Sequence, residues 1–184
     1  AEFHAQTAVE AAIKLHESVA SKLEIIDKIV IRTQEPAIRI ISKVGKLANA
    51  ADRDHCIQYM VAVGLIFGDL IAEYYEDDFH QENQLIDKLR DKMIIEEDNQ
   101  FSMDYLDPEK RSIANAVQVF FNDGTCSDDI QIEYPIGHKK RREEGIPLLE
   151  EKFWNNLNTC FDKDKSKLIY DLCLDQEKLE LSLI

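Results

Sequence analysis

The sequence has few cysteines, and none of them lie close together along the chain. Cys56, Cys126, Cys160 and Cys173 are widely spaced, without a Cys-x-x-Cys pair. Zinc and iron–sulfur sites generally use closely spaced ligands, and disulfide scaffolds need a higher density of cysteine. We therefore expect four free thiols in a reducing compartment, with no metal and no other cofactor.

Positive charge and long apolar runs are also scarce. The 184 residues include 22 Lys and Arg against 36 Asp and Glu, which gives a net charge of −14. Such a chain repels the phosphates of nucleic acid. The longest apolar stretch, residues 60–67, is far shorter than the roughly 20 residues that cross a bilayer. We therefore expect a folded soluble domain with neither a nucleic acid nor a membrane as partner.

The N-terminus lacks the marks of a natural start. The chain begins Ala1-Glu2-Phe3-His4-Ala5, without an initiator Met, a basic leader region or an Arg-rich transit pattern. Its length suits one domain or slightly more. We expect this sequence to be a piece of a longer protein.

Apolar periodicity and turn residues divide the chain into helices and strands. The expected helices cover residues 5–23, 36–44, 49–74, 78–93, a segment that opens at Pro147, and 165–174. The expected strands cover residues 25–33, 93–97, 116–122 and 130–134. The turn sequence Asn122-Asp123-Gly124 predicts that the last two strands form a hairpin. The sum is an α+β fold with a small antiparallel sheet and packed helices.

The helix expected over residues 49–74 is apolar on nearly every side, so it belongs inside the fold. Asn49 and Asp52 are the candidates for its N-cap. Gly64 and Gly68 would lie on one face of this helix. They would allow close contact with another element or, alternatively, the approach of a ligand to the backbone.

Two histidines and a tyrosine are candidates for acid–base chemistry. His55 and Tyr59 are four residues apart, so both would project from one face near the start of the buried helix. Such a pair can supply a proton donor and an acceptor. The structural alternative is a pair that satisfies its own hydrogen bonds inside the core. For His4, near the start of the first helix, the alternative is an ordinary surface histidine.

The connection after the hairpin concentrates positive charge. The run His138-Lys139-Lys140-Arg141-Arg142 follows Gly137, which lets a ligand approach the backbone. Lys and Arg donors suit a small polycarboxylate, because Arg can bind a carboxylate through two parallel hydrogen bonds. The alternative is a solvated charge run balanced by Glu143 and Glu144. Because no aromatic residues are interleaved, the run does not favour nucleic acid.

Four segments, in order along the chain, carry a more specific signal. They are Ala1-Glu2-Phe3-His4-Ala5-Gln6-Thr7-Ala8, Ala51-Asp52-Arg53-Asp54-His55-Cys56-Ile57-Gln58-Tyr59-Met60, Asp107-Pro108-Glu109-Lys110-Arg111 and Glu133-Tyr134-Pro135-Ile136-Gly137-His138. Together they resemble the C-terminal part of enzymes of the MmgE/PrpD family. Long strings in this order are far more specific than any single motif above, and the likeness thins beyond about residue 153.

The resemblance implies a hydro-lyase of the methylcitrate cycle of propionate breakdown. It would remove water from 2-methylcitrate to give 2-methyl-cis-aconitate, without an iron–sulfur cluster. Family enzymes have a large all-helical domain that carries a smaller α+β lid, with the active site between them, and they usually form dimers. Residues 1–145 would be the lid, with a junction helix over 1–22. Residues 146–184 would be helices that return to a missing N-terminal helical domain, so the fragment alone is expected to be inactive.

The resemblance also carries individual residues over. His4 matches the histidine at the domain junction, Tyr59 the tyrosine of the lid helix that faces the active site, and His55 its neighbouring histidine. All three become catalytic candidates, because dehydration needs a base and an acid. The candidates for binding the carboxylates of a tricarboxylate substrate are Gly137, His138, Lys139, Lys140 and Arg141. Many relatives have small residues and an Asn-Pro where this chain has the basic run.

Two other functions fit the sequence. One is a related family enzyme, similar to cis-aconitate decarboxylase or to an epimerase, that acts on a di- or tricarboxylate. The other is a non-catalytic acidic module that binds a protein partner. Family dehydratases are cytoplasmic in bacteria and mitochondrial in eukaryotic microbes, and the Asn, Lys and Ile usage favours the mitochondrial matrix. A homodimer is expected in either compartment.

Overall fold

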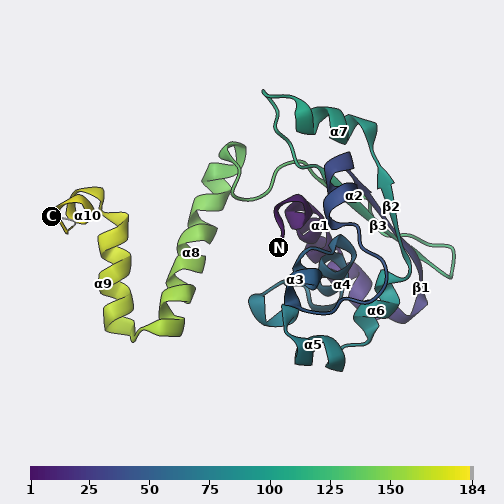
Figure 1. The fold of residues 1–184 in the computed structure, drawn as a ribbon, viewed down its shortest axis with the longest axis horizontal. Helices are drawn as coiled ribbons and strands as arrows, with labels where there is room; N and C mark the ends of the chain where they lie inside the picture. Colours follow the sequence, from purple (N-terminus) through teal and green to yellow (C-terminus); the bar gives the residue numbers. More distant parts are fainter. Residues whose placement is uncertain (183–184) are drawn as a thin grey trace. The chain divides into compact units, whose positions relative to one another are not determined.

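A computed structural model describes residues 1–182, which divide into two compact units. The first unit runs from Ala1 to Pro135 and contains the sheet, whereas the second begins at Ile136 and is helical (Figure 1). The limit expected at residue 145 falls inside a helix of the second unit. No helix within residues 1–182 is both long enough and apolar enough to cross a membrane.

The first unit mixes helices and strands, which confirms the α+β class. Its elements in chain order are η1 (Phe3–Ala5), α1 (Gln6–Val19), η2 (Ala20–Ile25), β1 (Ile26–Thr33), α2 (Glu35–Ile41), α3 (Ala50–Asp54), α4 (Ile57–Phe67), η3 (Ala72–Tyr75), α5 (Asp77–Glu82), α6 (Leu85–Arg90), β2 (Met93–Glu97), α7 (Asn99–Leu106), β3 (Asn115–Phe121) and β4 (Ile130–Ile132). The prefix η denotes a 3₁₀ helix.

The strands of residues 1–135 form one sheet in the order β2-β1-β3-β4. β3 pairs antiparallel with β1 and with β4, and Gly124 has the positive φ, +83°, that the hairpin turn needs. The predicted hairpin is therefore confirmed. β1 and β2 are parallel, so the expectation of an antiparallel sheet is wrong for this pair. The long helical connection between them lets the chain re-enter the sheet in the same direction.

The core lies where α1 packs on β3, β4 and α4 (Figure 1). A Cβ at Gly64 would lie only 3.0 Å from the Cβ of Ala12, so the glycine lets α4 approach α1 closely. Gly68 ends α4 in the left-handed conformation, with φ +70°, against the ring of His16. The close contact expected at these glycines is confirmed, and the contacting element is α1.

The buried helix expected over residues 49–74 is in fact two helices. Asn49 caps α3 as predicted, because its Oδ1 accepts a hydrogen bond from the amide of Asp52. The chain then leaves the helical conformation at His55 and Cys56 before α4 begins. One straight helix cannot keep the charged turn of α3 near solvent and also bury α4 on every side. The sequence pattern therefore overestimated the length of this helix.

Other element limits differ in smaller ways. Residues 78–93, expected as one helix, form α5 and α6 with a break at Asn83. α1 tightens into η2 after Val19, and α2 already ends at Ile41. Sequence patterns missed α7, whose N-cap Asp98 accepts hydrogen bonds from two backbone amides. Its short and largely polar sequence offers little periodicity.

The second unit consists of helices. They are η4 (Lys139–Arg141), α8 (Arg142–Cys160), α9 (Lys163–Leu174) and α10 (Gln176–Ser182). α8 begins at Arg142, before the expected start at Pro147, because η4 already turns the chain. The helix expected over 165–174 corresponds to α9. Sequence patterns did not predict α10, which begins after Asp175 accepts a hydrogen bond from the amide of Lys178.

Candidate acid–base site

His4 is held in place at the junction of η1 and the sheet. The Glu2 carboxylate caps the turn by accepting a hydrogen bond from the amide of His4 at 2.8 Å. Asn115, the first residue of β3, donates through Nδ2 to the His4 carbonyl at 2.8 Å and to the Thr7 hydroxyl at 2.6 Å. His4 is buried, so the alternative of an ordinary surface histidine is wrong.

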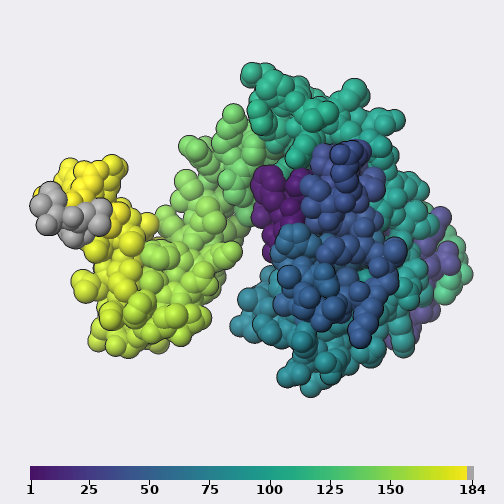
Figure 2. Space-filling model, in the orientation of Figure 1, coloured from purple at the N-terminus to yellow at the C-terminus, as the bar shows by residue number. Residues whose placement is uncertain are grey.

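The imidazole of His4 lies between a carboxylate and a phenol. Its Nδ1 is 2.8 Å from Oε1 of Glu2, and its Nε2 is 3.2 Å from the hydroxyl of Tyr105. A carboxylate only accepts hydrogen bonds, so the neutral ring carries its hydrogen on Nδ1 and Nε2 accepts from Tyr105. His4 lies near the protein surface, because its neighbour Phe3 is exposed. Figure 2 shows the N-terminal segment at the surface, beside the segment that forms α2.

This arrangement suits proton transfer. The free electron pair of Nε2 is the basic group of a neutral imidazole. Glu2 holds the ring in one tautomer and stabilises the positive charge that forms when Nε2 accepts a proton. Tyr105 adds a hydroxyl that can give a proton. A carboxylate, a base and a proton donor are thus joined by hydrogen bonds.

Tyr59 is fully buried in α4. Its hydroxyl donates to the carbonyl of Tyr74 at 2.6 Å, and its ring packs against Tyr75 and His80. Burial raises the pKa of the Tyr59 hydroxyl to about 12, with Asp87 adding to the rise and Arg53 opposing it. No hydrogen bond or ring contact within residues 1–182 joins Tyr59 to His4. The two candidates do not converge on one cluster in this unit.

His55 does not form the expected pair with Tyr59. It is the C-cap of α3, whereas Tyr59 belongs to α4, so the idea that both project from one helix face is wrong. The side chain of His55 is 49% exposed, and its Nδ1 is 3.4 Å from a carboxylate oxygen of Asp54. This histidine is therefore accessible to solvent, and the alternative of a mutually satisfied buried pair is wrong as well.

The basic run lies in the second unit, where η4 follows Gly137. The ring of His138 accepts a hydrogen bond from the amide of Lys140 at 3.2 Å. Arg141 donates to both carboxylate oxygens of Glu144, at 2.9 and 2.7 Å. The guanidinium of Arg141 is thus neutralised within its own segment, as the alternative of a balanced charge run expects. Lys139 and Gly137 complete the set of candidates for substrate binding.

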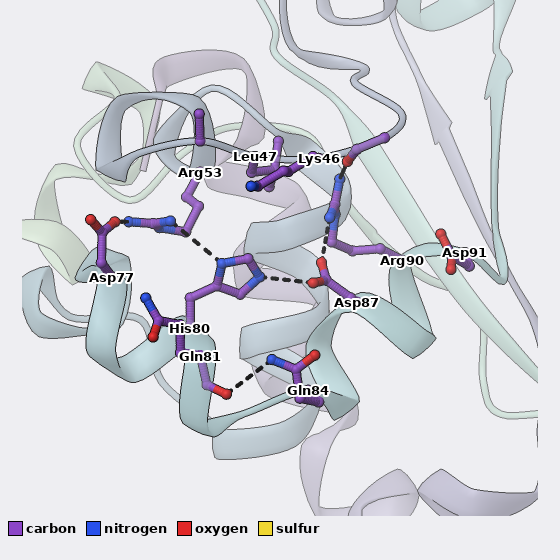
Figure 3. A pocket seen from close by; sticks show the side chains of 12 residues that line it. Lys46, Leu47, Arg53, Asp77, His80, Gln81, Gln84, Asp87, Arg90 and Asp91 are labelled. Atoms are coloured by element: carbon purple, nitrogen blue, oxygen red, sulfur yellow. Dashed lines mark hydrogen bonds and ion pairs between the residues drawn. The ribbon is translucent and has the colours of Figure 1, made fainter.

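Sequence reasoning missed a charged cluster that lines a cavity of about 640 Å³ (Figure 3). Arg53 of α3 is only 2% exposed. It donates through Nε to the carbonyl of Tyr75 at 2.6 Å and forms an ion pair with Asp77 of α5. Its Nη1 lies 3.4 Å from Nδ1 of His80. The arginine therefore joins three segments around the cavity.

His80 continues the cluster toward α6. Its Nε2 lies 3.0 Å from Oδ2 of Asp87, which also pairs with Arg90 (Figure 3). Arg90 donates in turn to the carbonyl of Gly45 at 3.0 Å. Since arginine only donates, Nδ1 of His80 accepts and Nε2 carries the hydrogen, which is the opposite tautomer to His4. The charges largely satisfy one another, so this cluster holds α3, α5 and α6 together.

The sequence contains little that could have revealed this cluster. Arg53 falls within one of the four family-like segments, but an arginine between two aspartates is typical of an exposed turn. His80 and Asp87 sit seven residues apart on two helices that periodicity merges into one. Within residues 1–182, no three His, Cys, Asp or Glu side chains are grouped as metal ligands. All four cysteines are free, as expected, and Cys56 is buried.

An α+β domain with a carboxylate–imidazole–phenol chain has the groups that acid–base enzymes use. Residues 1–176 match the family model of the MmgE/PrpD C-terminal domain, and the chain therefore belongs to the MmgE/PrpD family. The resemblance found in the four segments is thus confirmed.

Three relatives place the chain within that family. It is 52% identical over 183 residues to 2-methylcitrate dehydratase of Salmonella typhimurium, and 53% identical over 183 residues to that of Cupriavidus necator. Each match covers 98% of this chain and 38% of the relative. It is also 51% identical over 172 residues to the mitochondrial 2-methylcitrate dehydratase of Yarrowia lipolytica, covering 92% of the chain and 33% of the relative. The chain thus spans little more than a third of these enzymes.

Proposed function

We propose that this chain is the C-terminal part of a hydro-lyase that dehydrates 2-methylcitrate to 2-methyl-cis-aconitate. The support is that about half of the aligned residues are identical to those of bacterial and yeast enzymes that carry the name 2-methylcitrate dehydratase. Because the chain spans 38% of the bacterial enzymes, the reaction is proposed for a complete enzyme that contains this domain. The corresponding metabolic role is propionate breakdown through the methylcitrate cycle.

The contact between Glu2 and His4 is the observation that carries the proposal. Dehydration removes a proton from a carbon next to a carboxylate and expels hydroxide from the adjacent carbon, so it needs a base and an acid. His4 is the proposed base: Nδ1 bonds to the Glu2 carboxylate at 2.8 Å, which leaves Nε2 to accept the proton. The imidazolium that results is stabilised by the same carboxylate.

Tyr59 and His55 are further catalytic candidates that rest on the family resemblance. For Tyr59 to bind a substrate, its hydroxyl must exchange the hydrogen bond to the Tyr74 carbonyl for one to the substrate. For His55 the exposed imidazole beside Asp54 is accessible to a ligand. Both roles require the rest of the enzyme to bring the substrate to these side chains.

We propose that the segment from Gly137 to Arg141 attracts or holds the tricarboxylate substrate. His138, Lys139, Lys140 and Arg141 supply the basic groups, and Gly137 has open space around its Cα. Arg141 is bound to Glu144, so a substrate carboxylate must replace that carboxylate to reach the guanidinium. Neutralising substitutions at Lys139 and Lys140 should therefore raise KM more than they lower kcat.

The proposed partner of the chain is an N-terminal helical domain that completes the active site. α8 and α9 offer apolar side chains that such a domain can cover, since Leu148, Leu149 and Leu168 are each about half exposed or more. We further propose a homodimer. The proposed compartment is the mitochondrial matrix for a eukaryotic source, as in the named Yarrowia lipolytica relative, and the cytoplasm for a bacterial source.

The test uses the complete enzyme with 2-methylcitrate, citrate and cis-aconitate in separate assays. Absorbance measures double-bond formation, while mass spectrometry and carbon dioxide release identify the product. We expect dehydration of 2-methylcitrate and, in His4→Ala, a loss of at least about 100-fold in kcat. Lys14→Ala, in an exposed pair with Glu10, is the control. Carbon dioxide release without dehydration would instead support the decarboxylase alternative, and full turnover of His4→Ala would remove His4 from the catalytic groups.

A further inference from the structure

We infer that Tyr105 is the acid that protonates the departing hydroxyl group, and that its hydrogen bond to His4 is the path by which its proton is restored. The inference rests on the proposed dehydratase function and assigns a second catalytic residue to the same site. Tyr105 was not a candidate on sequence grounds, because it lies in α7, which sequence patterns did not predict.

The position of Tyr105 is fixed by packing of α7. Ser102, one turn earlier, accepts a hydrogen bond from the amide of Glu35 in α2 at 2.9 Å and donates to Glu97 at 2.7 Å. The Tyr105 ring lies 5.7 Å from the imidazole of His4, between ring centres. The phenol therefore approaches Nε2 from a helix that is attached to the rest of the unit at a second point.

The hydrogen bonds set the direction in which protons can move. In the neutral ring, Nδ1 donates its hydrogen bond to Glu2, so Nε2 carries no hydrogen and accepts a hydrogen bond from the Tyr105 hydroxyl. In that form the site holds a neutral imidazole with a basic nitrogen beside a phenol that carries its proton. These are the protonation states that a base and an acid need before a dehydration begins.

Every proton that is removed during one turnover is also returned. When substrate binds, the Tyr105 hydroxyl turns from Nε2 to the departing hydroxyl group, and the freed Nε2 of His4 takes the proton from the carbon next to a carboxylate. The electron pair of that C–H bond is held on this carboxylate as an enolate and then forms the double bond. The carbon–oxygen bond of the adjacent carbon breaks, and the departing hydroxide takes the proton of Tyr105 and leaves as water. The imidazolium then returns its extra proton to the phenolate across the 3.2 Å contact. Both residues end in their starting forms, and the net products are the alkene and water.

Tyr105 fits this role better than Tyr59. The Tyr59 hydroxyl already donates to the Tyr74 carbonyl, and burial raises its pKa to about 12, which makes it a weaker acid. The Tyr105 hydroxyl instead points at the proposed base itself. Its side chain is only partly buried, so a substrate can reach it without unpacking the core.

The experiment compares Tyr105→Phe with wild type in the complete enzyme, using two readouts in deuterated water. The first is formation of 2-methyl-cis-aconitate, and the second is exchange of the substrate C–H hydrogen for deuterium. We expect Tyr105→Phe to lose about 100-fold or more in kcat with KM within a few fold, while deuterium still enters the substrate. His4→Ala should lose both reactions, because the base itself is missing.

Controls separate this inference from the proposed function. Tyr170→Phe, in α9 of the second unit, should dehydrate the substrate at the wild-type rate. Thermal unfolding of each variant confirms that it is folded. If wild type dehydrates 2-methylcitrate and Tyr105→Phe matches it, only the role of Tyr105 is overturned. If wild type does not dehydrate 2-methylcitrate, the proposed function falls and the role of Tyr105 falls with it.

Glu2 acts on this site as a positioning residue, and its test is spectroscopic. In the 184-residue chain, long-range nitrogen–proton NMR correlations distinguish a ring with hydrogen on Nδ1 from one with hydrogen on Nε2. Wild-type His4 should be the Nδ1–H form and His80 the Nε2–H form. Glu2→Gln should remove the preference at His4 without changing His80, and Glu2→Asp should restore part of it. An Nε2–H form of His4 in wild type would overturn the inference.

Discussion

The carbonyl oxygen of Ile136 lies so close to Gly145 that a Cβ at residue 145 would be 2.3 Å from it. An alanine there cannot fit unless the backbone moves. We expect Gly145→Ala to destabilise the chain by about 1–3 kcal/mol, although alanine normally favours a helix. Urea unfolding followed by circular dichroism measures the change. The control is Gly137→Ala, where a Cβ meets nothing within 4 Å, and equal stability of the two variants would contradict this explanation.

The buried guanidinium of Arg53 gives a second prediction. Arg53→Met leaves the Tyr75 carbonyl and the His80 ring without their donor and breaks the ion pair with Asp77. We expect a loss of about 2–4 kcal/mol in the free energy of unfolding. Arg39→Met is the matched control, because the Arg39 side chain is 76% exposed and its pair with Glu35 should contribute about 0.5 kcal/mol or less. Similar losses in both variants would show that burial of Arg53 is not the cause.

The buried hydroxyl of Tyr59 predicts a loss of stability at high pH. Burial raises its pKa from 10.0 to about 12, so the folded state favours the neutral phenol. That stabilisation is complete below pH 10 and is lost as the pH rises from 10 to about 12. The free energy of unfolding should fall by up to about 3 kcal/mol across this window, since each unit of pKa corresponds to about 1.4 kcal/mol.

Tyr59→Phe tests that assignment. The free energy of unfolding of the variant should be about 1–2 kcal/mol lower than that of wild type at pH 7, because the Tyr74 carbonyl loses its hydrogen-bond donor. Above pH 10 this free energy should depend less on pH than it does in wild type. Part of the dependence should remain, since burial also raises the pKa of Tyr75. Urea unfolding at several values between pH 8 and pH 12 provides the measurement. An unchanged slope in the variant would assign the alkaline loss to other groups.

The backbone conformation of Arg111 predicts that a glycine at this position does not lower the free energy of unfolding. It is a non-glycine residue with φ +49°, in the turn between α7 and β3. The left-handed region costs such a residue about 1–2 kcal/mol, whereas glycine adopts it freely at some cost in chain entropy. Arg111→Gly should therefore equal or exceed the wild-type stability by up to about 1 kcal/mol. Arg39→Gly, in the middle of α2, should lose about 1 kcal/mol, and a loss of that size at both positions would contradict the argument.

Local sequence signals predicted much of the fold. The hairpin follows from an Asn-Asp-Gly turn between alternating strands, and a close contact of α4 with some other element follows from two glycines four residues apart. Each signal lies in residues that are neighbours in sequence, whereas the element that packs on the glycines was not predicted. The α+β class rests on such local patterns as well, which explains why it was predicted correctly.

Features that depend on distant residues were not predicted. The break at His55 and Cys56 arises because α4 must be buried on all sides, which no local pattern shows. The parallel pairing of β1 and β2 depends on how the intervening helices return the chain. The partner of His4 is Tyr105, about a hundred residues later, and the cluster around His80 draws on three helices. A resemblance to a family could mark His4, but only the three-dimensional contacts identify Glu2 and Tyr105.

The hydrogen bond from Asn115 to the His4 carbonyl also has a consequence for synthesis on the ribosome. The two residues are 111 positions apart, so the first turn of the domain waits for β3 to emerge before it is tied to the sheet. Until then the apolar face of α1 has no sheet to cover it. The sheet side of this core is therefore completed late in translation, after α4 is already available to pack on α1.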